Sequence, residues 1–160
     1  MKILILGATG RTGKWVVKYA LDEGYQVVCL TRNIKRINHA DHLEIIAGDP
    51  SRKSDLEKAL DGCDCVVSAL NISRTSDFPW SPLRTCKYFL SKVAQNIVDL
   101  TLRKNLRVIV CSAWGVGDTR KRIPFWFRWT IDYSNIKWAY HDHKRQEGIF
   151  ESSSLDWTII

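Results

Sequence analysis

The stretch Gly7-Ala8-Thr9-Gly10-Arg11-Thr12-Gly13 decides the fold of this chain. It follows the apolar run 2–6 and precedes a helical pattern of apolar residues that begins near Lys14. A buried strand, a turn with the spacing Gly-x-x-Gly-x-x-Gly and the start of a helix are typical of a dinucleotide-binding unit. An ordinary strand-to-helix turn is the alternative, but such a turn seldom needs three glycines.

Each glycine of this turn has a physical purpose. Gly7 permits the tight turn, Gly10 lets a pyrophosphate approach the backbone, and Gly13 lets the helix pack closely against the sheet. The free N–H groups at the start of the helix then face the anion. We expect the turn to contact the cofactor through Gly7, Thr9, Gly10, Arg11, Thr12 and Gly13.

The residues after the second expected strand, 25–30, predict which nicotinamide cofactor binds. An acidic residue at this place would bond the ribose 2′-hydroxyl of NAD. This chain has Thr31-Arg32-Asn33 instead, and a guanidinium suits a 2′-phosphate. Arg11 could flank the same phosphate, so the sequence predicts NADP (NADPH). We expect Lys35 and Arg36 to lie in a solvated loop.

The remaining pattern predicts an α/β fold, a Rossmann doubly wound parallel sheet flanked by helices. Residues 1–160 would form a single NAD(P)-binding domain. Further strands are expected at 43–47, 64–70, 106–111 and 156–160, and helices at 54–60, 83–103 and 134–152.

Ligands of such sheets bind outside the carboxyl ends of the strands, so residues at those ends are candidate contacts. We expect Asp49 at the adenine edge, although it could instead cap the next helix. Ser68, Ala69 and Leu70 would lie near the ribose, and Ser112 ends the fifth strand at the same edge.

The composition favours one globular domain. The chain has 160 residues, 45% of them hydrophobic, and a net charge of +7. A basic balance suits nucleic acid, an anionic membrane or an anionic small molecule. Without a zinc finger, an RNA-binding aromatic motif or a long basic helix, we expect no nucleic-acid partner. No apolar run is long enough to span a bilayer, and no signal-peptide pattern follows Met1.

The cysteines predict reduced thiols and no metal site. Cys63-Asp64-Cys65 has the wrong spacing for a zinc knuckle and lacks a second ligand pair. Cys29 and Cys111 lie inside expected strands, where thiols pack as small apolar groups. We therefore expect an intracellular, cytoplasmic protein.

The segment from Trp114 to Trp138 is rich in aromatic residues with arginine and lysine between them. We interpret it as a flexible aromatic lid over the pocket of a small-molecule acceptor. Three alternatives stay open: an aromatic core beneath a long loop, an anchor in a membrane interface, and a contact with another chain, which includes a homo-oligomer.

The motifs together resemble the short-chain dehydrogenase/reductase superfamily. They are the glycine turn, Thr31-Arg32, Gly48-Asp49 and Ser112, each after its own strand. The stretches Asp142-His143-Lys144-Arg145-Gln146-Glu147 and Leu155-Asp156-Trp157-Thr158-Ile159 resemble its atypical NAD(P)H-binding branch, which includes flavin/biliverdin-reductase-like and nitrogen-regulator-like proteins. Members usually continue with Arg-Pro and a further substrate-binding portion, so we expect this chain to be shortened at its C-terminus.

The resemblance implies a catalytic group of Ser112, Tyr140 and Lys144. In the superfamily's reductases the tyrosine donates a proton to the carbonyl, the lysine lowers its pKa, and the serine bonds the carbonyl oxygen. The four-residue spacing places Tyr140 and Lys144 on one helix face. Tyr140 could instead belong to the core, and His141 and His143 are further candidate proton donors.

These inferences predict an NADPH-dependent oxidoreductase of the atypical short-chain type. Hydride would pass to a small carbonyl, flavin or quinone-like acceptor. The alternative is a non-catalytic NADP-binding redox sensor that reports to a partner through the aromatic segment.

Overall fold

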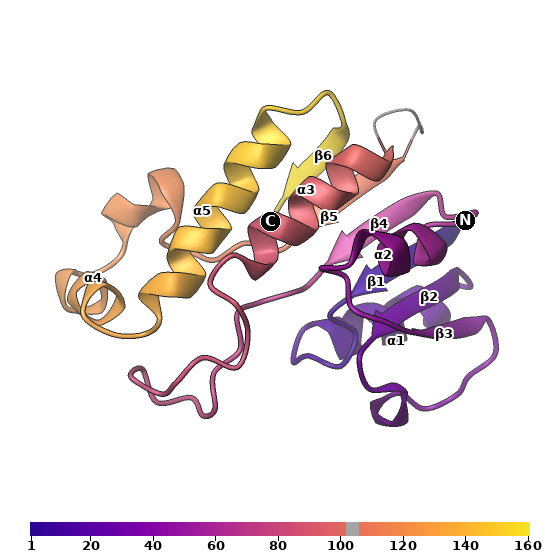
Figure 1. The fold of residues 1–160 in the computed structure, drawn as a ribbon, viewed down its shortest axis with the longest axis horizontal. Helices are drawn as coiled ribbons and strands as arrows, with labels where there is room; N and C mark the ends of the chain where they lie inside the picture. Colours follow the sequence, from indigo (N-terminus) through magenta and orange to yellow (C-terminus); the bar gives the residue numbers. More distant parts are fainter. Residues whose placement is uncertain (102–105) are drawn as a thin grey trace.

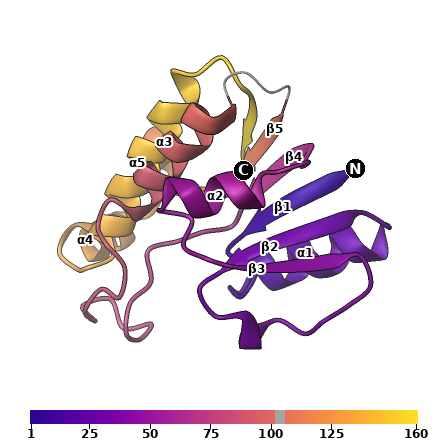
Figure 2. The same cartoon turned by 45° about the vertical axis from the view of Figure 1, so that its right-hand side comes forward.

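The computed structural model describes residues 1–101 and 106–160, and in this part of the chain six strands form one parallel sheet. The spatial order is β3-β2-β1-β4-β5-β6, and Figure 2 shows β1 between β2 and β4. This confirms the expected Rossmann fold. The strands are β1 (Lys2–Leu6), β2 (Gln26–Thr31), β3 (Leu43–Ala47), β4 (Cys65–Ser68), β5 (Arg107–Val110) and β6 (Asp156–Ile159).

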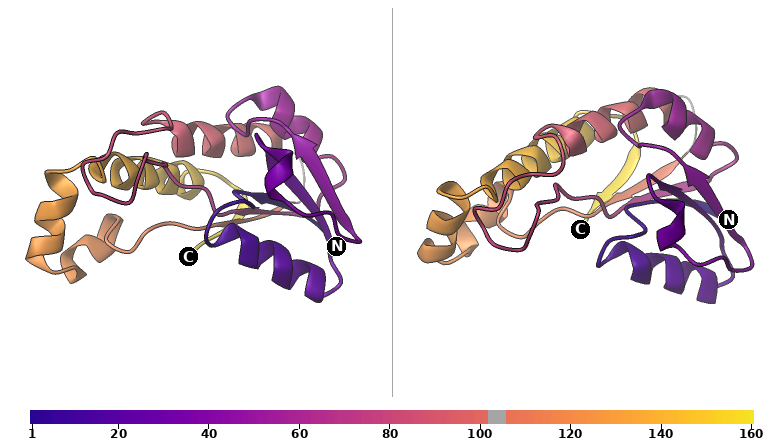
Figure 3. Two further views of the ribbon diagram at one scale, coloured as in Figure 1. Left: turned by 90° about the horizontal axis from the view of Figure 1, so that it is seen from below. Right: turned by 60° about the horizontal axis from the view of Figure 1, so that its bottom comes forward.

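Helices cover both faces of the sheet (Figures 1 and 3). The chain runs outward from β1 in one direction and from β4 in the other, and right-handed crossovers then place the connecting helices on opposite faces. α1 lies on one face, whereas α2, α3 and α5 lie on the other. The helices are α1 (Gly13–Asp22), α2 (Lys53–Ala59), α3 (Phe89–Thr101), α4 (Phe125–Asp132) and α5 (Lys137–Glu151), with 3₁₀ turns η1 (Ile34–Arg36) and η2 (Gly117–Arg122).

The central strand β1 divides its side chains between two cores. Leu4 and Leu6 pack in the cluster that includes α2, α3 and α5, while Ile3 and Ile5 pack with Val17 of α1 and its neighbours. Successive side chains of a strand point to opposite faces, so a strand covered on both sides must be apolar throughout. The apolar run in the sequence is therefore the signature of the strand at the middle of the sheet.

α3 and α5 are joined by a buried carboxylate. Asp142 is 0% exposed and accepts hydrogen bonds from the Leu90 N–H at 2.7 Å and the Ser91 hydroxyl at 2.6 Å. The Ser91 N–H also points to it, at 3.4 Å. Free N–H groups at the start of a helix need such an acceptor, so Asp142 of α5 caps α3.

The helix expected at 83–103 begins later than predicted. Leu83 forms an antiparallel bridge with Arg74, and the Arg84 N–H donates to the Ser73 carbonyl at 2.8 Å. Because these backbone groups are paired with the preceding strand-like segment, they cannot join a helix, and α3 starts at Phe89. Residues 102 and 103 of the expected helix lie outside the described residues.

The segment 114–138 is more regular than a flexible loop. It contains η2 and α4, and the helix expected at 134–152 is α5, which begins at Lys137. α4 starts directly after Pro124, a residue that suits the beginning of a helix because it has no N–H to leave unpaired.

The turn after β1 brings α1 against the backbone of the sheet edge. A Cβ atom built on Gly13 would lie 2.0 Å from the Gly7 carbonyl oxygen, far inside contact distance. Gly7 itself has a φ of +85°, and a Cβ there would lie 2.6 Å from the Ala69 carbonyl oxygen. Both positions therefore require glycine.

We predict that Gly13→Ala lowers the free energy of unfolding by about 3 kcal/mol or more, because backbone must move to admit the methyl group. The matched control is Gly148→Ala, since Gly148 lies inside α5 with nothing within 4 Å of its Cβ position. That change should raise stability by about 0.5–1 kcal/mol. Urea denaturation of both variants checks this, and equal effects would show that the close approach at Gly13 is not limiting.

Candidate functional site

A cavity of about 870 Å³ opens at the carboxyl ends of the central strands; we call it the main cavity. Its walls come from the glycine turn, the ends of β2, β4 and β5, the hairpin that follows β4, and α5. It lies at the point where the strand order reverses, between β1 and β4, where doubly wound sheets bind their ligands. The lining residues are Gly7, Thr9, Gly10, Arg11, Thr12, Arg32, Arg36, Ala69, Leu70, Asn71, Ile72, Ser73, Arg74, Ser76, Asp77, Arg84, Cys111, Ser112 and His143.

Most of the expected cofactor contacts line this cavity together. They are Gly7, Thr9, Gly10, Arg11, Thr12, Arg32, Ala69 and Leu70. Gly13 and Ser68 are buried beside the cavity without lining it. The Gly10 N–H donates to the Gly7 carbonyl at 2.9 Å, which closes the turn.

Asp49 lies outside the lining residues. Its carboxylate accepts a hydrogen bond from the Ser51 N–H at 2.9 Å, an Asx turn, and its own N–H donates to the Asp55 carboxylate at 3.0 Å. The alternative of a helix cap is also not seen, since the residue before α2 is Arg52. Asp49 thus shapes the link between β3 and α2.

Two arginines lie beside the end of β2. Arg32 and Arg36 both line the main cavity, and the Arg32 guanidinium lies 5.9 Å from the ring centre of Phe89. Stacking on an aromatic face leaves the edge of a guanidinium free for an anion. Lys35 is exposed, as expected, and does not line the cavity. Arg36 is also exposed, but its place in the cavity wall was not foreseen from the sequence.

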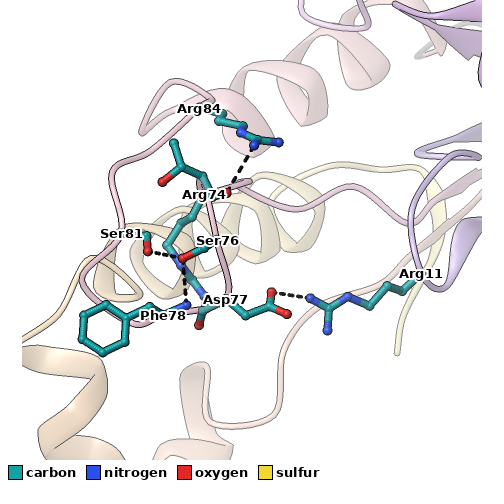
Figure 4. A network of polar contacts seen from close by, with 8 residues as sticks. Arg11, Arg74, Ser76, Asp77, Phe78, Ser81 and Arg84 are labelled. Atoms are coloured by element: carbon teal, nitrogen blue, oxygen red, sulfur yellow. Dashed lines mark hydrogen bonds and ion pairs between the residues drawn. The ribbon is translucent and has the colours of Figure 1, made fainter.

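A hairpin of residues 73–84 contributes several lining residues to the main cavity, and Figure 4 shows its polar contacts. Besides the Arg74–Leu83 bridge, the Thr75 N–H donates to the Pro82 carbonyl at 2.9 Å. The Trp80 indole N–H donates to the Tyr133 carbonyl at 2.8 Å, so the hairpin rests on the end of α4. From the sequence, the polar residues 73–82 with their two prolines suggest a loop over the cofactor side of the sheet, so the cross-strand pairing is not predicted.

The hairpin is tied to the glycine turn by an ion pair. Arg11 donates to the carboxylate of Asp77, and Figure 4 shows the two side chains extended toward each other. Both side chains are more than 80% exposed. Exposed ion pairs contribute little to stability, so this contact orients the hairpin more than it holds the fold.

The charge of the main cavity favours an anion. Five arginines and one aspartate line it, and that aspartate is already paired with Arg11. Arg74 and Arg84 donate to the backbone carbonyls of Asp77 and Thr75, at 3.4 and 3.2 Å. A cleft lined by one sign of charge attracts ligands of the other sign. Arg74 and Arg84 carried no signal in the sequence, because only the hairpin turns them toward the glycine turn.

The structure does not join Ser112, Tyr140 and Lys144. Ser112 donates to the Glu147 carboxylate, and the Tyr140 hydroxyl donates to the Trp114 carbonyl at 3.1 Å. Burial raises the pKa of Tyr140, an effect that Arg120 opposes. Lys144 is exposed, and within the described ranges no hydrogen bond connects it to Tyr140. The trio therefore stays a prediction from the resemblance.

A second cavity lies beside the main one, and Ser112 lines both. It holds about 840 Å³ and is lined by Trp114, Lys144 and Glu147 among other residues. The aromatic side chains of α4 line neither cavity: Phe125 is 76% exposed and Trp126 60%. This contradicts the alternative of an aromatic core for these side chains. Their position also gives no support to a lid over the main cavity.

His143 is the histidine that reaches the main cavity. It is 2% exposed, and neither ring nitrogen has a hydrogen-bond partner in the part of the chain that the structure describes. Burial lowers the pKa of His143 to about 4, so the imidazole is neutral at pH 7. His141, by contrast, is exposed and lies against Trp138 with the ring centres 6.3 Å apart.

The described residues contain neither a metal-binding cluster nor a membrane-spanning helix. Among residues 1–101 and 106–160, no three His, Cys, Asp or Glu side chains come together as a metal site. Within the same residues, no helix has both the length and the apolar character needed to cross a bilayer.

A doubly wound sheet with a glycine turn and an arginine-lined cavity at its switch point is typical of a dinucleotide-binding protein. The chain belongs to the NAD(P)H-binding family, whose sequence profile matches residues 7–160. This assignment confirms the NAD(P)H-binding character that the sequence predicts.

Similar proteins agree with this assignment. The photosystem II assembly factor Ycf39 of Cyanophora paradoxa is 40% identical over 79 residues, which cover 48% of this chain and only 24% of that protein. A short-chain dehydrogenase/reductase of Veillonella parvula in complex with NADP has a TM-score of 0.72 at 20% identity, over 99% of this chain and 67% of that one. ChuY, an anaerobillin reductase of Escherichia coli O157:H7, has a TM-score of 0.71 at 19% identity, over 99% and 71%. At such identities the two structures show the shared fold.

The buried His143 predicts a sensitivity of the fold to acid. The unfolded chain binds a proton at this residue near pH 6.5, whereas the folded chain resists it down to about pH 4. The free energy of unfolding therefore decreases as the pH falls from about 6.5 to about 4, by about 3 kcal/mol at most. In His143→Phe this loss should disappear, while the exposed His141→Phe should retain it. Urea unfolding at several pH values between 4 and 7 measures the difference, and a His143→Phe curve parallel to wild type would contradict the assignment.

Proposed function

We propose that this chain binds NADPH in the main cavity and transfers its hydride to a small acceptor, as an NADPH-dependent oxidoreductase. The observation that carries the proposal is the continuity of the cavity. One space runs from Arg32 and Arg36, past the bare glycine turn, to Ser112 and His143. It therefore offers a phosphate site at one end and polar groups for chemistry at the other.

The residues fit such a cofactor in three respects. The backbone at Gly7 and Gly10 leaves room for a pyrophosphate, which the N-terminus of α1 would stabilise. Arg32 and Arg36 would hold the 2′-phosphate. Leu70 and Ser112, at the ends of β4 and β5, would border the nicotinamide. When bound, NADPH supplies a hydride at its nicotinamide ring, which the protein itself cannot provide.

The acceptor belongs to a carbonyl, flavin or quinone-like class in this proposal. A lining of leucine, isoleucine and serine at the β4–β5 end of the cavity suits a flat, partly apolar molecule with a few polar atoms. The ChuY reductase, which shares the fold, supports a reductase among the candidates.

A redox sensor is the second candidate function, favoured by two observations. The hydroxyl of Tyr140 is engaged by a backbone carbonyl instead of facing the main cavity. The aromatic side chains of α4 are exposed, as a surface that contacts a partner would require. In this case the chain would bind NADPH without oxidising it.

We predict that wild type prefers NADPH to NADH and that Arg32→Ala removes much of the preference. The loss of a charge-assisted contact should cost NADPH binding about 1.5–3 kcal/mol, or roughly 10- to 150-fold in Kd, with NADH nearly unchanged. Lys35→Ala is the matched control, because Lys35 is a nearby cation outside the cavity wall. Fluorescence titration of each cofactor measures the Kd values. Equal affinity of wild type for both cofactors would overturn the choice of NADPH.

Turnover separates the enzyme from the sensor. We expect wild type to oxidise NADPH when menadione, FMN or an aromatic aldehyde is present, followed by the loss of absorbance at 340 nm. A chain that binds NADPH tightly but oxidises it with no member of this panel would support the sensor instead.

A further inference from the structure

Helix α5 presents a different side chain to the main cavity than the sequence motif predicts. Lys144 lies in the wall of the second cavity, and Tyr140 is bonded to the Trp114 carbonyl. The residue of α5 that lines the main cavity is His143. If hydride transfer occurs there, the polar group that α5 contributes is an imidazole.

The imidazole of His143 is buried without a hydrogen bond from any of the described residues. A buried polar group without a partner costs about 1–3 kcal/mol, and both ring nitrogens of His143 are in this condition. Buried polar groups in native structures are nearly always bonded, so the two unpartnered nitrogens of a residue that lines a cavity suggest a missing partner there. A neutral imidazole has one N–H donor and one acceptor nitrogen, which suits an uncharged polar atom.

The place of His143 decides which part of the ligand it meets. Cys111 and Ser112, which share the cavity wall with it, follow β5, on the β4–β5–β6 side of the switch point. The two halves of such a sheet each hold one mononucleotide, and the arginines after β2 mark the adenosine half. His143 therefore belongs to the half where the nicotinamide and the acceptor would meet.

We propose that the neutral imidazole of His143 donates a hydrogen bond to the oxygen or ring nitrogen of the acceptor that gains negative charge during reduction. This inference rests on the proposed oxidoreductase function and names the residue that serves it. A neutral histidine acts in this way as the electrophile of triosephosphate isomerase, a worked case of imidazole polarising a carbonyl.

For a carbonyl acceptor, bound NADPH would supply the hydride that forms a C–H bond at the carbonyl carbon, and the π electron pair of the carbonyl would move to its oxygen. The hydrogen bond from His143 stabilises the oxygen as its charge grows. A proton from water that enters the open cavity completes the hydroxyl group, so the acceptor is reduced by two electrons and the cofactor oxidised by two. His143 stays neutral throughout.

The neighbouring polar groups do not replace His143 in this task. Ser112 already donates its proton to Glu147. Gln146, one turn along α5, has a buried amide nitrogen without a partner but does not line the main cavity. Asn71, after β4, also lines the cavity, but it is exposed, whereas the imidazole of His143 is a buried nitrogen group on the β5 side.

The test compares His143→Phe and His143→Gln with wild type, using NADPH and menadione. Phenylalanine fills the space without a donor, whereas glutamine restores an N–H. We expect His143→Phe to lower kcat by about 10-fold or more with the Kd for NADPH within about 2-fold of wild type, and His143→Gln to recover part of the rate. His141→Phe is the control for changing a histidine of the same helix, since His141 is exposed and lines neither the main nor the second cavity.

Three outcomes would overturn the proposal. An unchanged kcat in a folded His143→Phe protein would make the residue structural only. A loss of NADPH affinity equal to the loss of rate would place the contact on the cofactor. A loss of rate in Tyr140→Phe, with none in His143→Phe, would restore the tyrosine–lysine group.

A separate readout covers the case in which wild type turns over no acceptor, which would refute the oxidoreductase function. The imidazole ¹⁵N resonances of His143, assigned by their loss in His143→Gln, are followed as menadione is added to the NADP⁺ complex. A shift of these resonances, with those of His141 unmoved, supports contact with the acceptor. No shift at saturating menadione rejects it.

Discussion

The close approach of α1 to the backbone after β1 is the constraint on which the rest of the structure depends. Because no Cβ fits at Gly13 or Gly7, the helix can begin directly against the sheet, next to the turn that lines the main cavity. A larger residue at either place would push the helix outward and fill the space where a phosphate could lie. Fold and anion site thus have one origin, which is a backbone without side chains at two positions.

The sheet then collects groups that are far apart in the chain. Strand order reverses between β1 and β4, so the segments after β1, β2, β4 and β5 all reach one edge. The hairpin of residues 73–84 closes this edge from the far side and adds Arg74 and Arg84 to the arginines after β2. The cationic character of the cavity is therefore a property of the assembled edge, since no single stretch of sequence contains it.

The sequence was sufficient for features set by local backbone geometry. The strand–turn–helix at Gly7–Gly13 follows from residue size, and the position of Arg32 follows from the end of an apolar run. It was insufficient where tertiary pairing decides. The hairpin shifted the start of α3 to Phe89, because Arg84 pairs with Ser73 across the hairpin. Helical spacing places Tyr140 and Lys144 on one face of the helix, but it does not tell which cavity that face borders. The position of His143 in the wall of the main cavity therefore could not be predicted from the sequence.

Two consecutive residues of α5, Asp142 and His143, contact the core and the main cavity respectively. The carboxylate of Asp142 holds the beginning of α3, while the next side chain, His143, reaches the cavity. A helix fixed by a buried cap has little freedom to rotate, which keeps the imidazole in place without a partner of its own. The same arrangement limits evolutionary change. A mutation that reorients this turn of α5 also weakens the contact between Asp142 and the start of α3. Adaptation to a new ligand is therefore easier on the exposed hairpin than on α5.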